Sequence, residues 1–188
     1  RDLHSFPTRR SSDLEASAPS AALGLSGLDG SVTLSEATAQ LGTVVDENVD
    51  VTQGADAITT LTVSYAGGSE RPEDQLSIRH QGTGAGQVGV SGFDISYEGT
   101  VIGTVNAADT GANGDNLVVD FNGSATAQAV ERVIENLRYQ TSSDGPLASR
   151  TIQVQVTDAA SATTTQAMAI NITAEDEGVQ PLFGDEQV

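Results

Sequence analysis

The chain has 188 residues, of which 37% are hydrophobic, 4% aromatic and 18% charged, and it holds no cysteine. This composition excludes a disordered or fibrous chain, and the missing cysteine excludes disulfides, zinc–thiolate sites and thiol catalysis. The 26 acidic residues stand against only 8 arginines and no lysine, a formal net charge of −18, which disfavours nucleic acid and anionic membranes and attracts cations. No apolar run approaches the roughly 18 residues of a membrane-spanning helix, so we expect no membrane insertion.

The two ends of the chain differ from its middle. Residues 5–14 (SFPTRRSSDL) resemble one reading frame of a short-read sequencing adapter, so we interpret residues 1–14 as an artefact outside the fold. The alternative is a genuine basic arm, since three of the arginines lie there. Residues 15–28, rich in Ala, Ser and Gly, are typical of a linker. We expect a β-domain over residues 29–174, and over 175–188 an acidic exit linker or the start of another unit.

Between these ends, apolar and polar residues alternate with the period of β-strands. In the segment RTIQVQV, Ile152, Val154 and Val156 share one face, which predicts a half-buried antiparallel strand. Further strands are expected from residue 31 and over residues 58–65, 75–80, 93–98, 100–106, 116–121, 137–141, 150–158 and 163–173. Gly- and Asp-rich turns separate them at short intervals, which favours an all-β, mainly antiparallel sandwich of about eight to ten strands.

One segment has a helical period instead. Val130, Val133, Ile134 and Leu137 repeat at helical spacing, and Ser124 or Thr126 is available as the N-cap. The pattern predicts one short α-helix near residues 125–136, packed on the core of the sandwich.

Three features suggest catalysis or nucleotide binding, and each lacks the context that the chemistry needs. Residues 84–89 (GAGQVG) satisfy the dinucleotide pattern, but an alternating segment follows in place of a helix, which indicates a turn. Asp109 begins the triplet DTG of aspartic proteases, but no second copy supplies the partner carboxylate. His80 is the one histidine outside residues 1–14, so it has no second histidine to form a metal site with. We expect no enzyme activity, with the Asp109 protease as the least favoured alternative.

Calcium is the ligand for which suitable residues are abundant. It takes about six to eight oxygen ligands, so clusters of Asp, Glu and Asn in turns are the relevant signal. Three clusters qualify, and they contain Asp46 and Asp50; Asp109 and Asp115; and Glu175, Asp176 and Glu177, with Asp158 at the turn before the last strand. For each cluster the alternative is a solvated acidic turn. We predict that at least one of them binds Ca²⁺ at a pole of the domain and stiffens it.

Several segments together carry a family resemblance. They are LTVSY (61–65), EDQLSI (73–78), GVSG (89–92), ISYEGTVIGTV (95–105), LVVDFN (117–122), ATAQAVERVIENLRYQTSSDGP (125–146) and RTIQVQVTDA (150–159). They resemble a cadherin-like repeat of very large bacterial surface and secreted proteins, over about residues 31–174. The resemblance implies an Ig-like sandwich, calcium-dependent rigidity and export to the cell surface or the medium. It also implies neighbouring repeats in the same polypeptide, and it matches Asp158 to the aspartate that ends the penultimate strand.

These observations favour a non-catalytic repeat module of a large extracellular adhesin, acting as a stiff spacer or as an adhesive unit. Its partners would be the adjacent repeats and a surface ligand, protein or glycan, that the sequence does not identify. The main alternative is a carbohydrate-binding module of a secreted protein. Such a module presents exposed aromatic side chains, and this chain has no Trp, three Tyr and four Phe.

Overall fold

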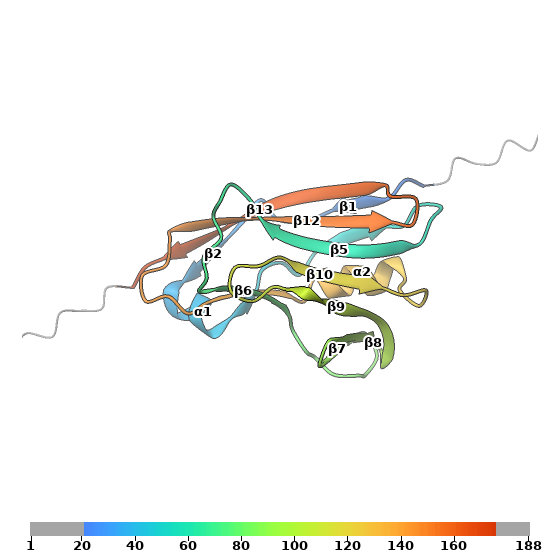
Figure 1. Ribbon diagram of the computed structural model, residues 1–188, viewed down its shortest axis with the longest axis horizontal. Helices are drawn as coiled ribbons and strands as arrows, with labels where there is room; N and C mark the ends of the chain where they lie inside the picture. The colour runs from blue at the N-terminus through green and yellow to red at the C-terminus, as the bar shows by residue number, and fades with distance from the viewer. Residues whose placement is uncertain (1–20, 176–188) are drawn as a thin grey trace, which may run out of the picture.

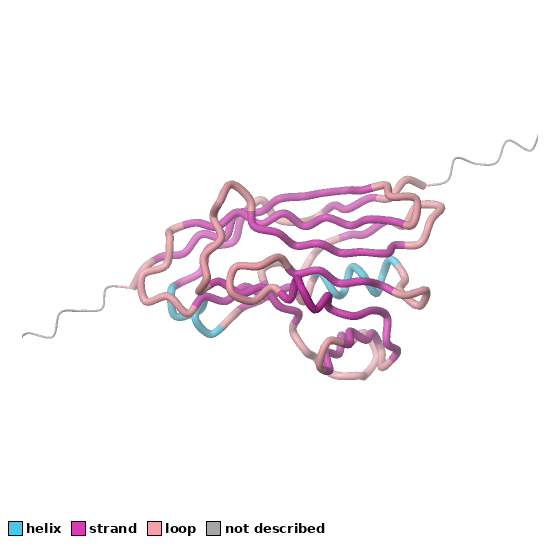
Figure 2. The backbone as a smooth tube through the Cα atoms, viewed as in Figure 1, coloured by secondary structure: helices cyan, strands magenta, loops and turns pink. Residues whose placement is uncertain are grey.

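The computed structural model describes residues 21–175, and strands make up about half of this part of the chain (Figures 1 and 2). The strands are β1 (Gly24–Ser26), β2 (Ser31–Ser35), β3 (Thr43–Val44), β4 (Asp50–Thr52), β5 (Ile58–Tyr65), β6 (Asp74–Ile78), β7 (Val88–Ser91), β8 (Asp94–Tyr97), β9 (Thr100–Thr110), β10 (Leu117–Phe121), β11 (Leu137–Thr141), β12 (Ser149–Asp158) and β13 (Thr163–Thr173). The helices are α1 (Glu36–Leu41) and α2 (Ala127–Ile134), one toward each end of the long axis (Figure 2).

Most strands belong to one of two sheets. The larger has eight strands in the order β2-β13-β12-β5-β10-β9-β8-β7, and the smaller has three in the order β3-β11-β6; β1 and β4 form a separate pair. Every hydrogen-bonded pair is antiparallel except β2 with β13, which run parallel. The all-β, mainly antiparallel sandwich is therefore confirmed. Figure 1 shows the larger sheet curling, so that β7 and β8 lie below β9 and β10.

The core forms where the alternating strands of the two sheets face each other. Ile152, Val154 and Val156 of β12 are fully buried, as their common face predicts. From the smaller sheet, Leu76 and Leu137 contribute side chains with no exposed surface to the same core. Burial of about 1.5–3 kcal/mol per large aliphatic side chain makes this shared face the main source of stability.

The expected helix is present as α2, shorter than the segment 125–136. The Thr126 hydroxyl accepts a hydrogen bond from the backbone N–H of Ala129 at 3.2 Å, which caps the helix, and Val130, Val133 and Ile134 are buried. The sequence predicts one helix, and the structure has a second, α1. Helix α1 has six residues and begins at a local cap, where Ser35 accepts from the N–H of Thr38 at 3.2 Å. A helix this short shows too few turns for its period to stand out.

The structure corrects several expected boundaries. Residues 21–175 contain thirteen strands and not eight to ten, because β1, β3, β4 and β7, with two to four residues each, were not predicted. Strand β1 lies inside the expected linker 15–28, paired with β4. Strand β9 continues to Thr110 although a loop is expected after residue 106. The glycine-rich segment 84–89 begins as the predicted turn, with φ of 73° at Gly86, but its last two residues belong to strand β7. Residues 1–14, Asp176 and Glu177 lie outside the described residues.

The described chain begins and ends at opposite ends of the sandwich (Figure 1). We call the end that holds residue 21 the N-terminal pole and the end that holds residue 175 the C-terminal pole. At the N-terminal pole, residues 21–23 lie against Gly54, and the turn after β12 bonds to Ala57 through the N–H of Ala159. At the C-terminal pole, β13 ends beside α1. None of the helices described here is both long and apolar enough to cross a membrane.

Candidate functional site

Asp158 lies at the N-terminal pole and Glu175 at the opposite pole. The Asp158 carboxylate is nearly buried, and its Oδ1 accepts the backbone N–H of Ala160 at 3.0 Å and of Ala162 at 2.9 Å. One oxygen of Asp158 therefore shapes the turn between β12 and β13. The other makes no hydrogen bond within the described residues.

Asp46 and Asp50 occupy different environments although they are four residues apart. Asp46 is buried, and it accepts the N–H of Asp29 at 2.6 Å and of Asn48 at 2.9 Å. Asp50 is exposed and accepts the hydroxyl of Ser26 at 3.3 Å. Asp46 thus holds a loop together, and the two carboxylates do not form one cluster.

Asp109 and Asp115, by contrast, do come together. Both line one hollow of about 330 Å³, shared with Glu70 and Tyr65. Asp109 is half-buried near the end of β9, whereas Asp115 is exposed in the turn before β10. The sequence placed both in one loop, and the structure places the first of them in a strand.

At the C-terminal pole, the last described residue is tied to the first turn of α1. The N–H of Glu175 donates to the buried carboxylate of Glu36 at 3.0 Å. Over residues 21–175, no three Asp, Glu or His side chains gather closely enough to hold a metal ion. Calcium binding stays a prediction.

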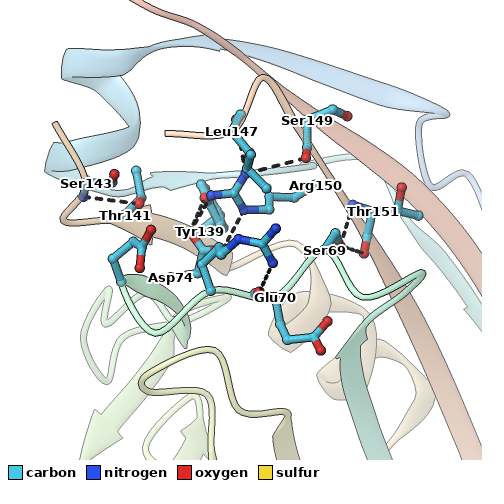
Figure 3. Close-up of polar contacts among 12 residues, drawn as sticks. Ser69, Glu70, Asp74, Tyr139, Thr141, Ser143, Leu147, Ser149, Arg150 and Thr151 are labelled. Atoms are coloured by element: carbon cyan, nitrogen blue, oxygen red, sulfur yellow. Dashed lines mark hydrogen bonds and ion pairs between the residues drawn. The ribbon is translucent and has the colours of Figure 1, made fainter. Parts of the chain in front are cut away.

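The strongest polar cluster in the described chain is one that sequence reasoning missed (Figure 3). Arg150 of β12 and Asp74 of β6 form an ion pair in which neither side chain has any exposed surface. Arg150 Nε donates to Asp74 Oδ2 at 2.5 Å, and Nη2 donates to Oδ1 at 3.1 Å. Tyr139 of β11 donates its hydroxyl to the same Oδ1 at 2.7 Å. The cluster therefore joins the larger sheet to the smaller one.

The remaining donors of Arg150 are also engaged. Its Nη1 donates to the carbonyl of Leu147 at 3.1 Å, in the loop that precedes β12. A buried guanidinium is tolerated when its charge is paired and its nitrogens donate hydrogen bonds, and here all three nitrogens of Arg150 do so. Burial is the largest influence on the pKa of Arg150 and lowers it, but the hydrogen bonds to Asp74 together with the charges of Asp74 and the two nearby tyrosines outweigh burial, so this pKa is raised.

Two tyrosines beside the pair share this environment. Burial raises the pKa of Tyr139, and its hydrogen bond to Asp74 raises it further. Burial likewise raises the pKa of Tyr65, with the Asp74 charge adding to the effect. Within the described residues the Tyr65 hydroxyl is buried without a hydrogen-bond partner. These phenols stay neutral across the ordinary pH range, so the cluster is built for packing and charge neutralisation.

Comparison with known protein families, with curated proteins and with solved structures found no match to this chain. The fold itself is compatible with an Ig-like domain.

Proposed function

We propose that the chain is a non-catalytic spacer module, one repeat in a tandem array of a large extracellular protein. The observation that carries the proposal is the position of the two ends of the described chain, at opposite poles of an elongated sandwich (Figure 1). Such modules add their lengths when they are joined end to end. A domain whose ends lay side by side would fold the array back on itself.

The terminal strands support a force-bearing role. Strands β2 and β13 are hydrogen-bonded neighbours and run parallel over five residue pairs, from Ser31 with Ala169 to Ser35 with Thr173. Tension pulls β2 toward the N-terminal pole and β13 toward the C-terminal pole. The two strands are then sheared along their length, so their hydrogen bonds resist together. Strands pulled apart from one end would instead lose their bonds one at a time.

The buried pair of Arg150 and Asp74 adds a second resistance. It links β12, the neighbour of β13, to β6 in the other sheet. Sliding one sheet over the other would separate two charges in a region without water. Removing such a pair by breaking one partner costs about 3–5 kcal/mol, so the link opposes movement between the layers.

Calcium is part of the same proposal. When modules stack, Asp158 at one pole approaches the acidic C-terminal pole of the preceding copy, where Glu36 and Glu175 lie. Like charges brought together repel, and a divalent cation between them would fix the angle of the junction. The resemblance to cadherin-like repeats, which carry calcium at such junctions, points the same way. The adhesive role and the extracellular location rest on that resemblance.

A fusion of two copies of the whole chain tests the proposal. Its thermal unfolding and its maximum dimension in solution scattering are measured in calcium, in magnesium and in chelator. Calcium at 100 times its dissociation constant would add about 2.7 kcal/mol, or about 5–11 °C for a domain of this size. The spacer proposal predicts an extended pair in every condition, and the calcium part predicts a rise that magnesium does not match.

Two results would contradict the proposal. A compact pair, with the second copy folded back on the first, would refute the spacer role. Equal effects of calcium and magnesium at the same ionic strength would show that calcium acts only by screening charge. That result would end the calcium assignment and leave the spacer role in place.

A further inference from the structure

A polar cavity of about 240 Å³ lies between the C-terminal end of α2 and the segment that joins β6 to β7. Its lining is almost entirely polar and comes from three parts of the chain. The side chains that matter are Glu47, Arg79, Gln81, Arg132, Glu135 and Asn136. Known ligand pockets begin at about 300 Å³, so this one suits a single small ligand and not an oligomer.

The cavity has a buried anchor. Asn136 is only 2% exposed, and its Oδ1 accepts Arg79 Nε at 2.8 Å. Its Nδ2 donates to the carbonyl of Arg132 at 2.8 Å, at the end of α2. Both hydrogen bonds fix the amide, and the amide fixes the plane of the Arg79 guanidinium. The outer nitrogen Nη2 of Arg79 then lies 3.5 Å from Glu47 Oε1, a loose contact at the rim.

The second guanidinium in the cavity belongs to Arg132, and Glu135 holds it in place. Arg132 Nη1 pairs with Glu135 Oε2 at 2.5 Å, and the Glu135 side chain is nearly buried. Within the described residues, Nε and Nη2 of Arg132 and Nη1 of Arg79 take part in no hydrogen bond. Gln81 uses its Oε1 to accept the N–H of Val88 at 3.1 Å, which leaves its amide nitrogen to donate. The cavity therefore presents several oriented donors without partners.

Two arginines in one cavity are unusual for this chain, although two glutamates line the same cavity and balance their charge. Of the other arginines in the described part, Arg71 and Arg138 bond to backbone carbonyls and Arg150 is buried in its ion pair. Among residues 21–175, only this cavity is lined by two guanidinium groups with unused donors. The fork of N–H groups on each arginine matches the two oxygens of a carboxylate.

The carboxylates in the same cavity limit what the ligand can be. Glu47 and Glu135 would repel a phosphate or sulfate dianion, but each has oxygen left to accept from a neutral hydroxyl. The fitting ligand has one carboxylate for the arginines and several hydroxyls for the glutamates and Gln81. We propose that the cavity binds a single hexuronate, an acidic sugar with this combination of groups. The site goes beyond the spacer role and does not depend on it.

Amide chemical shifts of the whole chain, titrated with glucuronate, test the site. Glucose and acetate are the reference ligands, because each carries only one half of the proposed recognition. We expect saturable shifts around residues 79–87 and 131–136, with a dissociation constant in the millimolar range. Glucuronate should bind at least about tenfold more tightly than either reference ligand, a difference of about 1.4 kcal/mol. Binding no tighter than acetate, no tighter than glucose, or without saturation would overturn the proposal.

Variants make the assignment specific. Arg132→Gln should weaken binding at least about tenfold, and Arg132→Lys should weaken it less, because it keeps the charge and loses the fork. Arg71→Gln is the matched control, since Arg71 lies outside the cavity, and it should bind as the unchanged protein does. Thermal unfolding of each variant separates lost binding from a lost fold. If Arg132→Gln does not fold, Arg132→Lys decides, and unchanged affinity in that folded variant would overturn the site.

Discussion

The substitution Asp74→Ala would leave the Arg150 guanidinium buried with no counter-charge and the Tyr139 hydroxyl without its acceptor. Neither side chain of the ion pair has exposed surface, so water cannot replace the lost carboxylate without opening the core. Breaking a buried pair in this way costs about 3–5 kcal/mol. A domain of this size has a free energy of unfolding of about 5–15 kcal/mol, so the loss is a large fraction of the total. At about 2–4 °C per kcal/mol, we expect the melting temperature to fall by about 6–20 °C.

Denaturant unfolding of a set of four proteins separates the pair from its surroundings: the unchanged chain, Asp74→Leu, Arg150→Met and both together. Each single change leaves a buried polar group alone, so the double variant should be far more stable than the sum of the single losses predicts. Glu47→Gln is the matched control, because the pair of Glu47 with Arg79 is exposed and is worth less than about 1 kcal/mol. The reasoning is wrong if Asp74→Ala costs no more than this control, or if the two single losses simply add.

Three further predictions concern titration and ion binding. Burial raises the pKa of Tyr65 and Tyr139 above the ordinary value of 10.0, so their contribution to stability is complete below pH 10.0 and is lost as the pH rises beyond it. Tyrosinate absorbance of these residues should therefore develop only with loss of the circular dichroism of the fold, and reversible ionisation in the folded protein would contradict this. Burial raises the pKa of Glu135 above its ordinary value of 4.5. The free energy of unfolding of the unchanged chain, minus that of the Glu135→Gln variant, should therefore fall as the pH rises through and above 4.5. A difference that rises with pH would contradict this prediction. In the two-copy fusion, calcium should raise the melting temperature more than magnesium at equal ionic strength, and equal rises would exclude a specific site.

The strands with a clear period could be predicted from the sequence alone. Strands β5, β11 and β13 have the expected limits, because residues suited to burial recur along each of them, at every second position in β11 and over residues 168–172 of β13. The helix α1 and the strands β3, β4 and β7 were not predicted, since segments of two to six residues are too short to display a period. Strand β1 was not predicted for a different reason. Its composition is that of a linker, and only pairing with β4 gives it regular structure.

The alternation of the sequence contains a pattern that indicates the buried ion pair. Arg150 has the same parity as Ile152, Val154 and Val156, so the alternation of β12 already places it facing the core. Asp74 is likewise in phase with Leu76 and Ile78 on β6. Charged residues at inward positions of two strands imply that they meet, because neither would be stable alone. Which strands face each other depends on topology, and the sequence does not display that.

The acidic clusters were harder to judge for a related reason. Asp46 and Asp158 look like exposed chelating residues in sequence, yet both are nearly buried and bond to backbone N–H groups of their own loops. Aspartates that shape turns and aspartates that bind calcium share the same local sequence. The polar cavity beside α2 had no sequence signal, because its residues come from three separated segments.

The direction in which β2 and β13 are loaded is the most direct test of the force-bearing role. The chain has no cysteine, so two introduced cysteines define where a single molecule is pulled. Pulling between the two ends of the chain shears β2 against β13, whereas pulling between cysteines at Leu41→Cys and Glu175→Cys, both at the C-terminal pole, separates the strands from one end. The account predicts an unfolding force severalfold higher in the first geometry than in the second. Equal forces in the two geometries would contradict it.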